Sequence, residues 1–213
     1  MQGAGEFSAS VGTRPRVLDL GDERDVKAAL QAGLVLGFPT ETVWGLGVTA
    51  ARAEASERLA QAKHRPPGKP FQVLCEGTEA ALALVAPPAH DRVRALSALW
   101  PGPLTLVVEA DATCPPWLAS QGRVGLRVPD HVTSRRLAAL AGGYLAGSSF
   151  NRSGGVPARN FEEARAAGLA EVLIRGEAAG GEPSTVFDVG SGALLRSGGV
   201  PAEALYEAWA CAR

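Results

Sequence analysis

The sequence has no long apolar run and almost no net charge. No stretch reaches the roughly 18 consecutive apolar residues of a membrane span, and residues 1–16 lack the apolar core of a secretory signal. We therefore expect a cytoplasmic protein that has no membrane partner. The formal net charge of −1 excludes a global positive field that would hold nucleic acid, so any RNA contact has to be weak and local.

Cysteine is also scarce. Cys75, Cys114 and Cys211 lie far apart, form no Cys-x-x-Cys pair and are odd in number. This pattern supports neither a disulfide framework nor a zinc site. We interpret them as buried or incidental thiols.

What is present suits one ordinary globular unit. The 213 residues are 46% apolar and 20% charged, and a chain of this length buries roughly 70% of its surface on folding. Residues 1–15 are small and polar without periodicity, so we expect a flexible leader there. Residues 16–213 are expected to form a single domain.

The apolar pattern predicts alternating strands and helices, and hence an open, twisted α/β sheet flanked by helices. Expected strands are 17–20, 34–38, 71–75, 104–109, 124–128, 144–148, 172–174, 185–189 and 193–195; expected helices are 22–33, with Asp22 as its cap, 50–62, 78–86, 89–99, 131–141, 161–167 and 201–210. A turn at 190–192 predicts a hairpin, so the sheet should be mixed. The glycine-rich stretch 176–183 predicts a mobile surface loop, or a lid over a site.

Four segments place polar or cationic side chains where apolar runs end, as ligand sites in open α/β sheets do. The first is the loop 39–47, in which Thr40 and Thr42 offer hydroxyl groups while two glycines allow a ligand to approach the backbone. The alternative is that this loop is only a structural turn.

The second segment, 63–70, sets Lys63, Arg65 and Lys69 beside prolines that stiffen the chain. Such a group suits an anion, because charge-assisted hydrogen bonds are the strong ones, but it also suits a solvated helix end. In the third segment Arg127 lies inside an apolar strand. A buried guanidinium needs an anionic partner, so Arg127 is either a carboxylate clamp or half of an internal salt bridge.

The fourth group combines residues 148–154, 184–188 and 195–198. Each segment puts hydroxyl, amide or guanidinium groups at the tip of an expected strand. Together they could line one polar cleft.

Taken in order, these segments resemble the YrdC-like threonylcarbamoyl-AMP synthases. The matching pieces are PTETVWGLG, KHRP followed by Pro70, LWPGPLTLVV, VGLRVPDH, SSFNRSG, STVFD and LLRSGG. They cover the chain from about residue 15 to its end. The resemblance implies an open α/β fold with a concave polar surface that binds ATP and L-threonine side by side, with Mg²⁺ on the phosphates.

Site residues follow from the same resemblance, position by position. The implied ATP ligands are Lys63, Arg65, Ser149, Asn151 and Arg196, with Arg159 and Arg123 as weaker candidates; the implied threonine ligands are Thr40, Arg127, Ser184 and Thr185. Lys63, Arg65 and Arg196 are the candidate catalytic residues. No side chain is assigned to a metal.

The sequence departs from the family pattern in several places. Trp44 stands where tyrosine is common, and Phe150 stands where a small residue normally precedes the asparagine. Longer members carry a histidine near Leu74 and a second, C-terminal domain, and this chain has neither. It looks like the short, single-domain form.

The resemblance implies a nucleotidyltransferase, an L-threonylcarbamoyladenylate synthase. The threonine amine would capture bicarbonate as a carbamate, whose oxygen attacks the α-phosphorus of ATP and expels pyrophosphate. The product would pass to downstream proteins that build threonylcarbamoyladenosine on tRNA. Two alternatives stay open: an RNA-binding module of the same fold without synthase activity, and another carbamoyl-adenylate-forming enzyme, such as the module of hydrogenase-maturation carbamoyltransferases that uses carbamoyl phosphate.

Overall fold

A ten-stranded mixed sheet organises the chain in the computed structural model, which describes residues 14–66 and 69–211. The strands are β1 (Arg16–Leu18), β2 (Leu36–Phe38), β3 (Gly45–Thr49), β4 (Gln72–Cys75), β5 (Leu104–Glu109), β6 (Arg123–Arg127), β7 (Tyr144–Ser149), β8 (Val172–Ile174), β9 (Thr185–Asp188) and β10 (Ala193–Arg196). Their order is β1-β8-β2-β3-β7-β4-β6-β5-β9-β10. The neighbours β1/β8, β8/β2, β4/β6 and β5/β9 are parallel and the rest antiparallel. The expected mixed sheet and the β9–β10 hairpin are therefore confirmed.

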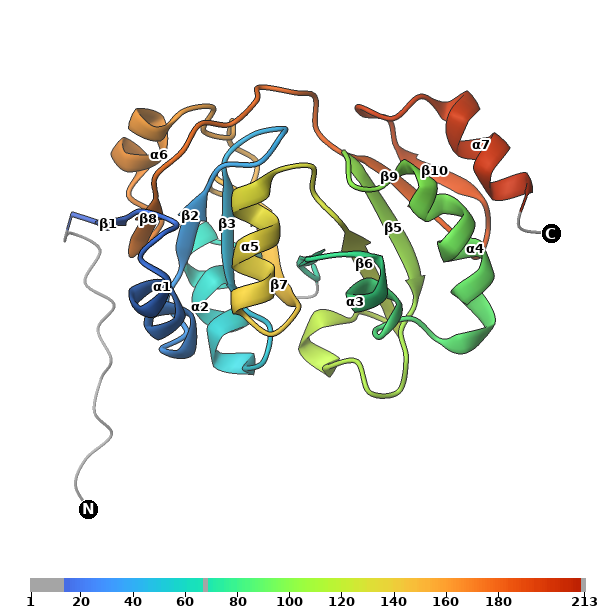
Figure 1. Cartoon of the computed structure of the whole chain (residues 1–213), viewed down its shortest axis with the longest axis horizontal. Coiled ribbons are helices and arrows are strands. Elements are labelled where there is room, and N and C mark those ends of the chain that lie inside the picture. The colour runs from blue at the N-terminus through green and yellow to red at the C-terminus, as the bar shows by residue number, and fades with distance from the viewer. Residues whose placement is uncertain (1–13, 67–68, 212–213) are drawn as a thin grey trace, which may run out of the picture.

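Seven α-helices and three short 3-10 turns flank this sheet in the described part of the chain (Figure 1). The α-helices are α1 (Glu23–Gln31), α2 (Ala53–Lys63), α3 (Thr78–Leu82), α4 (His90–Leu96), α5 (Val132–Leu140), α6 (Phe161–Ala167) and α7 (Ala202–Ala210). All seven fall where the apolar periodicity predicts a helix. Asp22 is the N-cap of α1, but its carboxylate accepts a hydrogen bond from the Asp19 amide and none from the helix, so its predicted capping bond is wrong.

The two faces of the sheet are covered unequally, and this makes room for a site. One apolar cluster packs α2, α3, α4, α6 and α7 against the sheet through residues such as Leu59, Leu96 and Leu205. A smaller cluster, which includes Leu30 from α1 and Leu137 from α5, packs against the half of the sheet that begins at β1. The remaining strands keep part of that second face open.

A long connection joins the two halves of the sheet. Residues 175–184 leave β8 and cross to β9 at the other end of the sheet, as the orange segment at the top of Figure 1 shows. The connection has no regular secondary structure, as its glycine-rich composition predicts. It is not isolated from the body of the protein, because the Ala179 amide donates to the Thr40 carbonyl oxygen and the Gly181 amide donates to that of Glu41.

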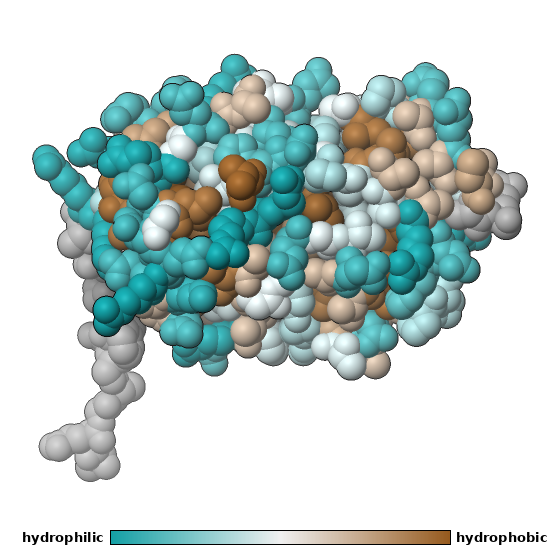
Figure 2. Space-filling view, in the orientation of Figure 1, coloured by the Kyte–Doolittle hydropathy of each residue, from teal (hydrophilic) through white to brown (hydrophobic). Residues whose placement is uncertain are grey.

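Two expectations concern the chain ends and the surface. The predicted leader, residues 1–15, falls almost wholly outside the described residues. Among the residues that are described, no helix is both long enough and apolar enough to cross a membrane. On the face shown in Figure 2, hydrophilic side chains cover most of the surface and the hydrophobic areas between them are small.

Candidate functional site

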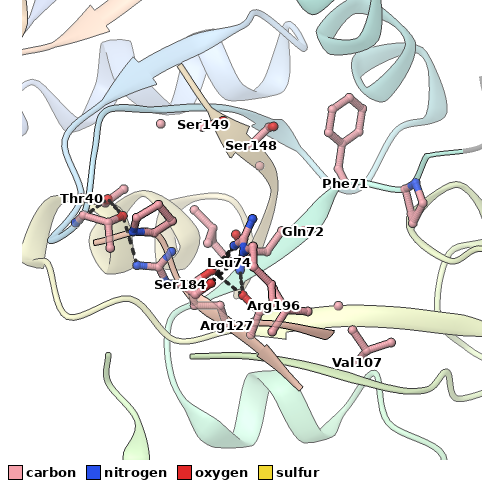
Figure 3. Close-up of a pocket in the computed structure, with 18 of the residues that line it drawn as sticks. Thr40, Phe71, Gln72, Leu74, Val107, Arg127, Ser148, Ser149, Ser184 and Arg196 are labelled. Carbon is pink, nitrogen blue, oxygen red and sulfur yellow. Dashed lines mark hydrogen bonds between the residues drawn. The ribbon is translucent and has the colours of Figure 1, made fainter. Parts of the chain in front are cut away.

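A cavity of about 720 Å³ opens on the less covered face of the sheet. Its wall comes from the loop after β2, from the central strands, and from the segments around β9 and β10, and Figure 3 shows these side chains converging from separate strands. The wall includes seven residues predicted for the site: Thr40, Arg65, Arg123, Arg127, Ser149, Ser184 and Arg196. Segments as far apart along the chain as those of Thr40 and Arg196 thus meet at one place, as the prediction of a shared cleft requires.

The strand register explains why the cavity lies there. Gly147 on β7, Gln72 on β4 and Gly125 on β6 are consecutive partners across the sheet, so all three belong to the same face. Val107 on β5 and Asp188 on β9 continue the row. Because two of these positions lack a side chain, the sheet forms a hollow floor between its apolar edges.

The same alternation places Thr185 outside the site. Val186 and Asp188 belong to the row that faces the cavity, so Thr185, the neighbour of Val186 on β9, points to the opposite face. Its hydroxyl accepts from the Val200 amide and donates to the Val200 carbonyl oxygen, and the residue is fully buried. The structure therefore gives Thr185 a structural position, and Ser184 alone of the predicted pair lines the cavity.

Arg127 occupies the end of the cavity nearest the loop 39–47. Its Nη2 donates to Glu41 Oε1 at 2.6 Å and its Nε donates to the Gly102 carbonyl oxygen. Only 6% of the Arg127 side chain and 13% of the Glu41 side chain are exposed. The internal salt bridge is therefore confirmed. Arg127 also lines the cavity, and its role as a carboxylate clamp stays a prediction.

The threonines of the loop 39–47 form a directional chain of hydrogen bonds. Arg127 Nη2 can only donate, so Thr42 accepts from it at 3.4 Å and donates to the Thr40 hydroxyl at 2.9 Å. The Thr40 hydroxyl in turn donates to the Val43 carbonyl oxygen at 2.6 Å. The hydroxyl proton of Thr40 is therefore used inside the loop, although the residue lines the cavity as predicted.

Arg196 and Ser184 form the middle of the wall. The Arg196 guanidinium donates to the Ser184 carbonyl oxygen through Nε and Nη2, and to the Ser184 hydroxyl through Nη2 at 2.9 Å. Burial lowers the pKa of Arg196, and the positive charge of Arg127 lowers it further. Two cations thus stand near each other across Ser184, an arrangement that favours an anion between them.

Arg65 lines the side of the cavity near Phe71. Its guanidinium lies 4.7 Å from the centre of the Phe71 ring and donates to the carbonyl oxygens of Lys69 and Pro70. Burial lowers its pKa. These contacts hold the charge in one orientation at the cavity wall, which is what an anion-binding arginine needs.

Lys63 takes a different position from the one predicted for a direct ATP ligand. The residue is 1% exposed and does not line the cavity. Its Nζ donates to the carbonyl oxygens of Ser149 at 2.5 Å and Asn151 at 2.6 Å. Burial, followed by the charge of Arg65, lowers the pKa of Lys63 to about 8.

Asn151 and Arg159 also lie off the cavity wall. The Asn151 amide group donates to the carbonyl oxygens of Arg152 and Gly155, and its Oδ1 accepts from the Ser149 hydroxyl at 2.5 Å. Asn151 therefore shapes the loop that carries Ser149. Arg159 is exposed before α6, where its backbone amide donates to Glu163.

Arg123, a weaker candidate, forms the far end of the wall with Asp188. The two side chains make a bidentate pair, with N–O distances of 2.7 and 2.6 Å. The hydrogen bond from Arg123 is the main cause that lowers the pKa of Asp188 to about 2. Asp188 also accepts from the amides of Gly190 and Ser191, which fixes the β9–β10 turn.

The two departures from the family pattern contact each other. The rings of Trp44 and Phe150 pack edge to face with centroids 6.3 Å apart, and both residues are buried. A Cβ atom at Gly37 would lie 2.4 Å from the Phe150 ring, so Gly37 makes the space that the large side chain needs. The local backbone accommodates Phe150 through this pair of small and large residues.

Sequence reasoning missed three residues that belong to the site. Gln72 and Thr105 line the cavity, and Glu41 binds Arg127. Glu41 lies inside the PTETVWGLG motif, so that motif could have drawn attention to it. Gln72 offered a weaker signal, as a polar residue in an expected buried strand.

Among the described residues, the cavity wall has few side chains that could bind a metal ion. Within residues 14–66 and 69–211 no group of three or more His, Cys, Asp or Glu side chains could hold a metal. Asp188 is the one acidic residue of the described cavity wall, and Arg123 already binds both of its oxygens. The described wall thus offers no free carboxylate to a metal ion.

Comparisons with known proteins agree with this geometry. The Sua5/YciO/YrdC family model, described as telomere recombination, matches residues 28–198. A threonylcarbamoyl-AMP synthase from Chromohalobacter salexigens is 40% identical over 81% of this chain and 95% of the relative, and one from Halorhodospira halophila is 35% identical over 87% and 96%. The structure of P. abyssi Sua5 complexed with L-threonine superposes with a TM-score of 0.82 at 29% identity. The match covers 92% of this chain but 61% of that longer one. The chain belongs to the Sua5/YciO/YrdC family.

Proposed function

We propose that this protein is an L-threonylcarbamoyladenylate synthase, which forms threonylcarbamoyl-AMP and pyrophosphate from L-threonine, bicarbonate and ATP. The observation that carries the proposal is the meeting of Arg127, Ser184 and Arg196 in one cavity, with Arg65 on a separate part of the wall. In the described part of the chain, Nη1 of Arg127 and Nη1 of Arg196 have no hydrogen-bond partner. These donors are left for the anionic groups of an amino acid and a nucleotide.

The proposed reaction needs positioning more than protein nucleophiles. The amine of threonine adds to bicarbonate and releases water, which gives a carbamate. A carbamate oxygen then forms a bond to the α-phosphorus of ATP while the bond to the bridging oxygen of pyrophosphate breaks. Because charge develops on phosphate oxygens, fixed cations lower the barrier without forming a covalent intermediate.

Three cations of the wall have a proposed task. Arg127 binds the threonine carboxylate at the end of the cavity lined by Thr40. Arg196, anchored on Ser184, and Arg65, anchored on Phe71 and two carbonyl oxygens, stabilise the phosphates. Mg²⁺ would neutralise charge on the phosphates when ATP is bound, held by phosphate oxygens.

Pyrophosphate release tests the proposal directly. The purified protein is assayed with ATP, Mg²⁺ and bicarbonate, with and without L-threonine, and carbamoyl phosphate replaces bicarbonate in a parallel reaction. We expect release that depends on both L-threonine and bicarbonate. Arg196→Ala should lower turnover by roughly 10- to 100-fold, the loss of one charged contact. Release that ignores threonine, or that requires carbamoyl phosphate, would assign the cavity to a different reaction.

A further inference from the structure

Gln72 stands in the middle of the cavity floor between two glycines. Its register partners are Gly147 on β7 and Gly125 on β6. A Cβ atom at Gly125 would lie 3.6 Å from the Thr105 methyl group, so a larger residue there would fill the space above β6. Because Gly125 leaves this space open, the Gln72 side chain crosses β6 and its Nε2 donates to Thr105 Oγ1 on β5.

Thr105 in turn contacts Ser184. The hydroxyl oxygens of Thr105 and Ser184 lie 2.9 Å apart, and both residues are buried. Since Thr105 already accepts a hydrogen bond from Gln72, its own proton is available for Ser184. Ser184 Oγ also accepts from Arg196 Nη2. Figure 3 shows Gln72, Ser184 and Arg196 close together on the cavity wall.

These bonds leave one direction for the Ser184 proton. A hydroxyl oxygen accepts two hydrogen bonds and donates one. When Thr105 donates across its 2.9 Å contact, Thr105 and Arg196 use both acceptor positions of Ser184, a residue that lines the cavity. The proton that remains is directed to a ligand.

We propose that Gln72 and Thr105 are positioning residues that make Ser184 an obligate hydrogen-bond donor to an anionic oxygen of the substrate, bound between Arg127 and Arg196. The inference rests on the proposed function for the identity of that anion, the carboxylate of the amino acid. A donor at Ser184 strengthens the binding of a carboxylate, which only accepts, and disfavours ligands that present a donor there. This chain of hydrogen bonds from Gln72 through Thr105 to Ser184, called the relay below, thus contributes to substrate selection.

Reversal of the relay tests the inference. In Gln72→Glu an ionised carboxylate accepts from Thr105, Thr105 then accepts from Ser184, and Ser184 turns a lone pair towards the ligand. The introduced charge also repels the ligand. The same change is therefore made in a Thr105→Val background, where the charge is present but the hydrogen bonds from Gln72 through Thr105 to Ser184 are lost. We expect Gln72→Glu to weaken L-threonine binding, measured by calorimetry, about tenfold more when Thr105 is present than when valine replaces it. Equal factors in the two backgrounds would overturn the relay.

Two further measurements separate this effect from a general loss of structure. Thr105→Ser keeps the hydroxyl and should retain wild-type affinity for L-threonine, whereas the KM for ATP should change little in all these variants. The affinity of Gln72→Glu should recover as the pH falls through about 6 to 4, because a protonated carboxyl group donates to Thr105 again. An affinity of Gln72→Glu that is independent of pH contradicts the relay.

A neutron structure of the deuterated, ligand-free protein reads the proton positions without reference to any reaction. We expect deuterium between Thr105 and Ser184 on the Thr105 oxygen, and the deuterium of Ser184 directed into the cavity. A deuterium of Ser184 directed at Thr105 would overturn the inference even if L-threonine binds. If wild-type protein does not bind L-threonine while the deuterium positions are as expected, the proposed function fails and the relay stands.

Discussion

The Nζ atom of Lys63 lies 2.5 Å from the backbone carbonyl oxygen of Ser149, and Lys63 itself does not line the cavity. A second carbonyl oxygen, that of Asn151, completes the contact at 2.6 Å. The ammonium group therefore joins the end of α2 to the loop that follows β7. Since Ser149 lines the cavity, Lys63 can affect ligand binding through the position of this loop.

Lys63→Met removes this link and keeps most of the side-chain volume. We expect kcat/KM for ATP to fall by about 10- to 100-fold, because two partly buried carbonyl oxygens lose a charged donor and the loop relaxes. Lys69→Met, which changes an exposed lysine of the same segment, is the matched control and should stay within about twofold of wild type. Equal activity of the two variants would show that the Ser149 loop keeps its position without Lys63.

The pKa of Lys63 gives this link a pH dependence. Burial lowers the pKa to about 8, so the ammonium is present below this value and is lost as the pH rises through it. We expect wild-type kcat/KM to decline above about pH 8 and the profile of Lys63→Met to lack this decline. The same alkaline limb in both profiles would assign the limb to another group.

The buried pair of Arg127 and Glu41 predicts a separation of stability from activity. Arg127→Met leaves the Glu41 carboxylate buried without its partner, and the loss of one member of a buried pair costs about 3 to 5 kcal/mol of unfolding free energy. In Arg127→Met/Glu41→Gln no uncompensated charge remains, so denaturant unfolding should show most of this stability restored. L-threonine binding should stay absent from the double variant. Recovery of binding along with stability would remove Arg127 from the carboxylate site.

Much of the fold was predictable because strong apolar patterns mark its elements. Strand β5 was expected with the bounds observed, and strand β8 likewise, since β8 is a short, continuous apolar run and β5 is rich in leucine and valine. Polar groups at the ends of such runs pointed to the cavity, and Arg127 drew attention as a cation within a buried strand. The prediction of a loop over 39–47 was less accurate, because β3 already begins at Gly45. Glycine gives little strand signal, and its extended conformation here depends on the neighbouring strands β2 and β7.

The sequence does not contain the register, and the remaining errors follow from this. Ser184 and Thr185 are adjacent and chemically alike, yet only one faces the cavity, because successive strand residues point to opposite faces. The site role of Gln72 depends on its alignment with Gly125 and Gly147, which lie more than 50 residues away along the chain. Such alignments come from the packing of the whole sheet.

The Arg123–Asp188 pair predicts an acid-sensitive contribution to stability. The pKa of Asp188 is about 2 in the folded protein, below the usual value of about 3.9, so the pair stabilises the fold above the unfolded pKa and loses this effect as the pH falls through the folded one. We expect the difference in unfolding free energy between wild type and Asp188→Asn to be about 1 to 2 kcal/mol at pH 6. The difference should shrink between about pH 4 and pH 2. A difference that does not vary with pH would mean that the amide contacts at the turn, rather than the ion pair, stabilise this region.

The contact of the connection 175–184 with the loop 39–47, here called the substrate loop, predicts that a change at Gly181 affects substrate binding. Gly181 lies against the loop 39–47, where a Cβ atom would be 2.7 Å from the Glu41 carbonyl oxygen. Gly181→Ala must therefore displace either the connection or the loop that carries Glu41 and Thr40. We expect L-threonine binding to weaken by about 3- to 10-fold, a change of about 0.7 to 1.4 kcal/mol, and amide hydrogen exchange at 176–183 to become faster.

Gly77→Ala is the matched control for this change, because a Cβ atom at Gly77 meets no atom within 4 Å and its φ of −168° suits any residue. In wild type, ATP and L-threonine together should slow exchange at 176–183 if the connection closes over the ligands as a lid. The connection contacts the loop 39–47 through the Ala179 and Gly181 amides, so substrate that orders the loop should also protect these two amides. Unchanged hydrogen exchange in wild type on addition of both ligands would exclude a lid. Normal L-threonine binding by Gly181→Ala would show that the substrate loop keeps its position independently of the connection 175–184.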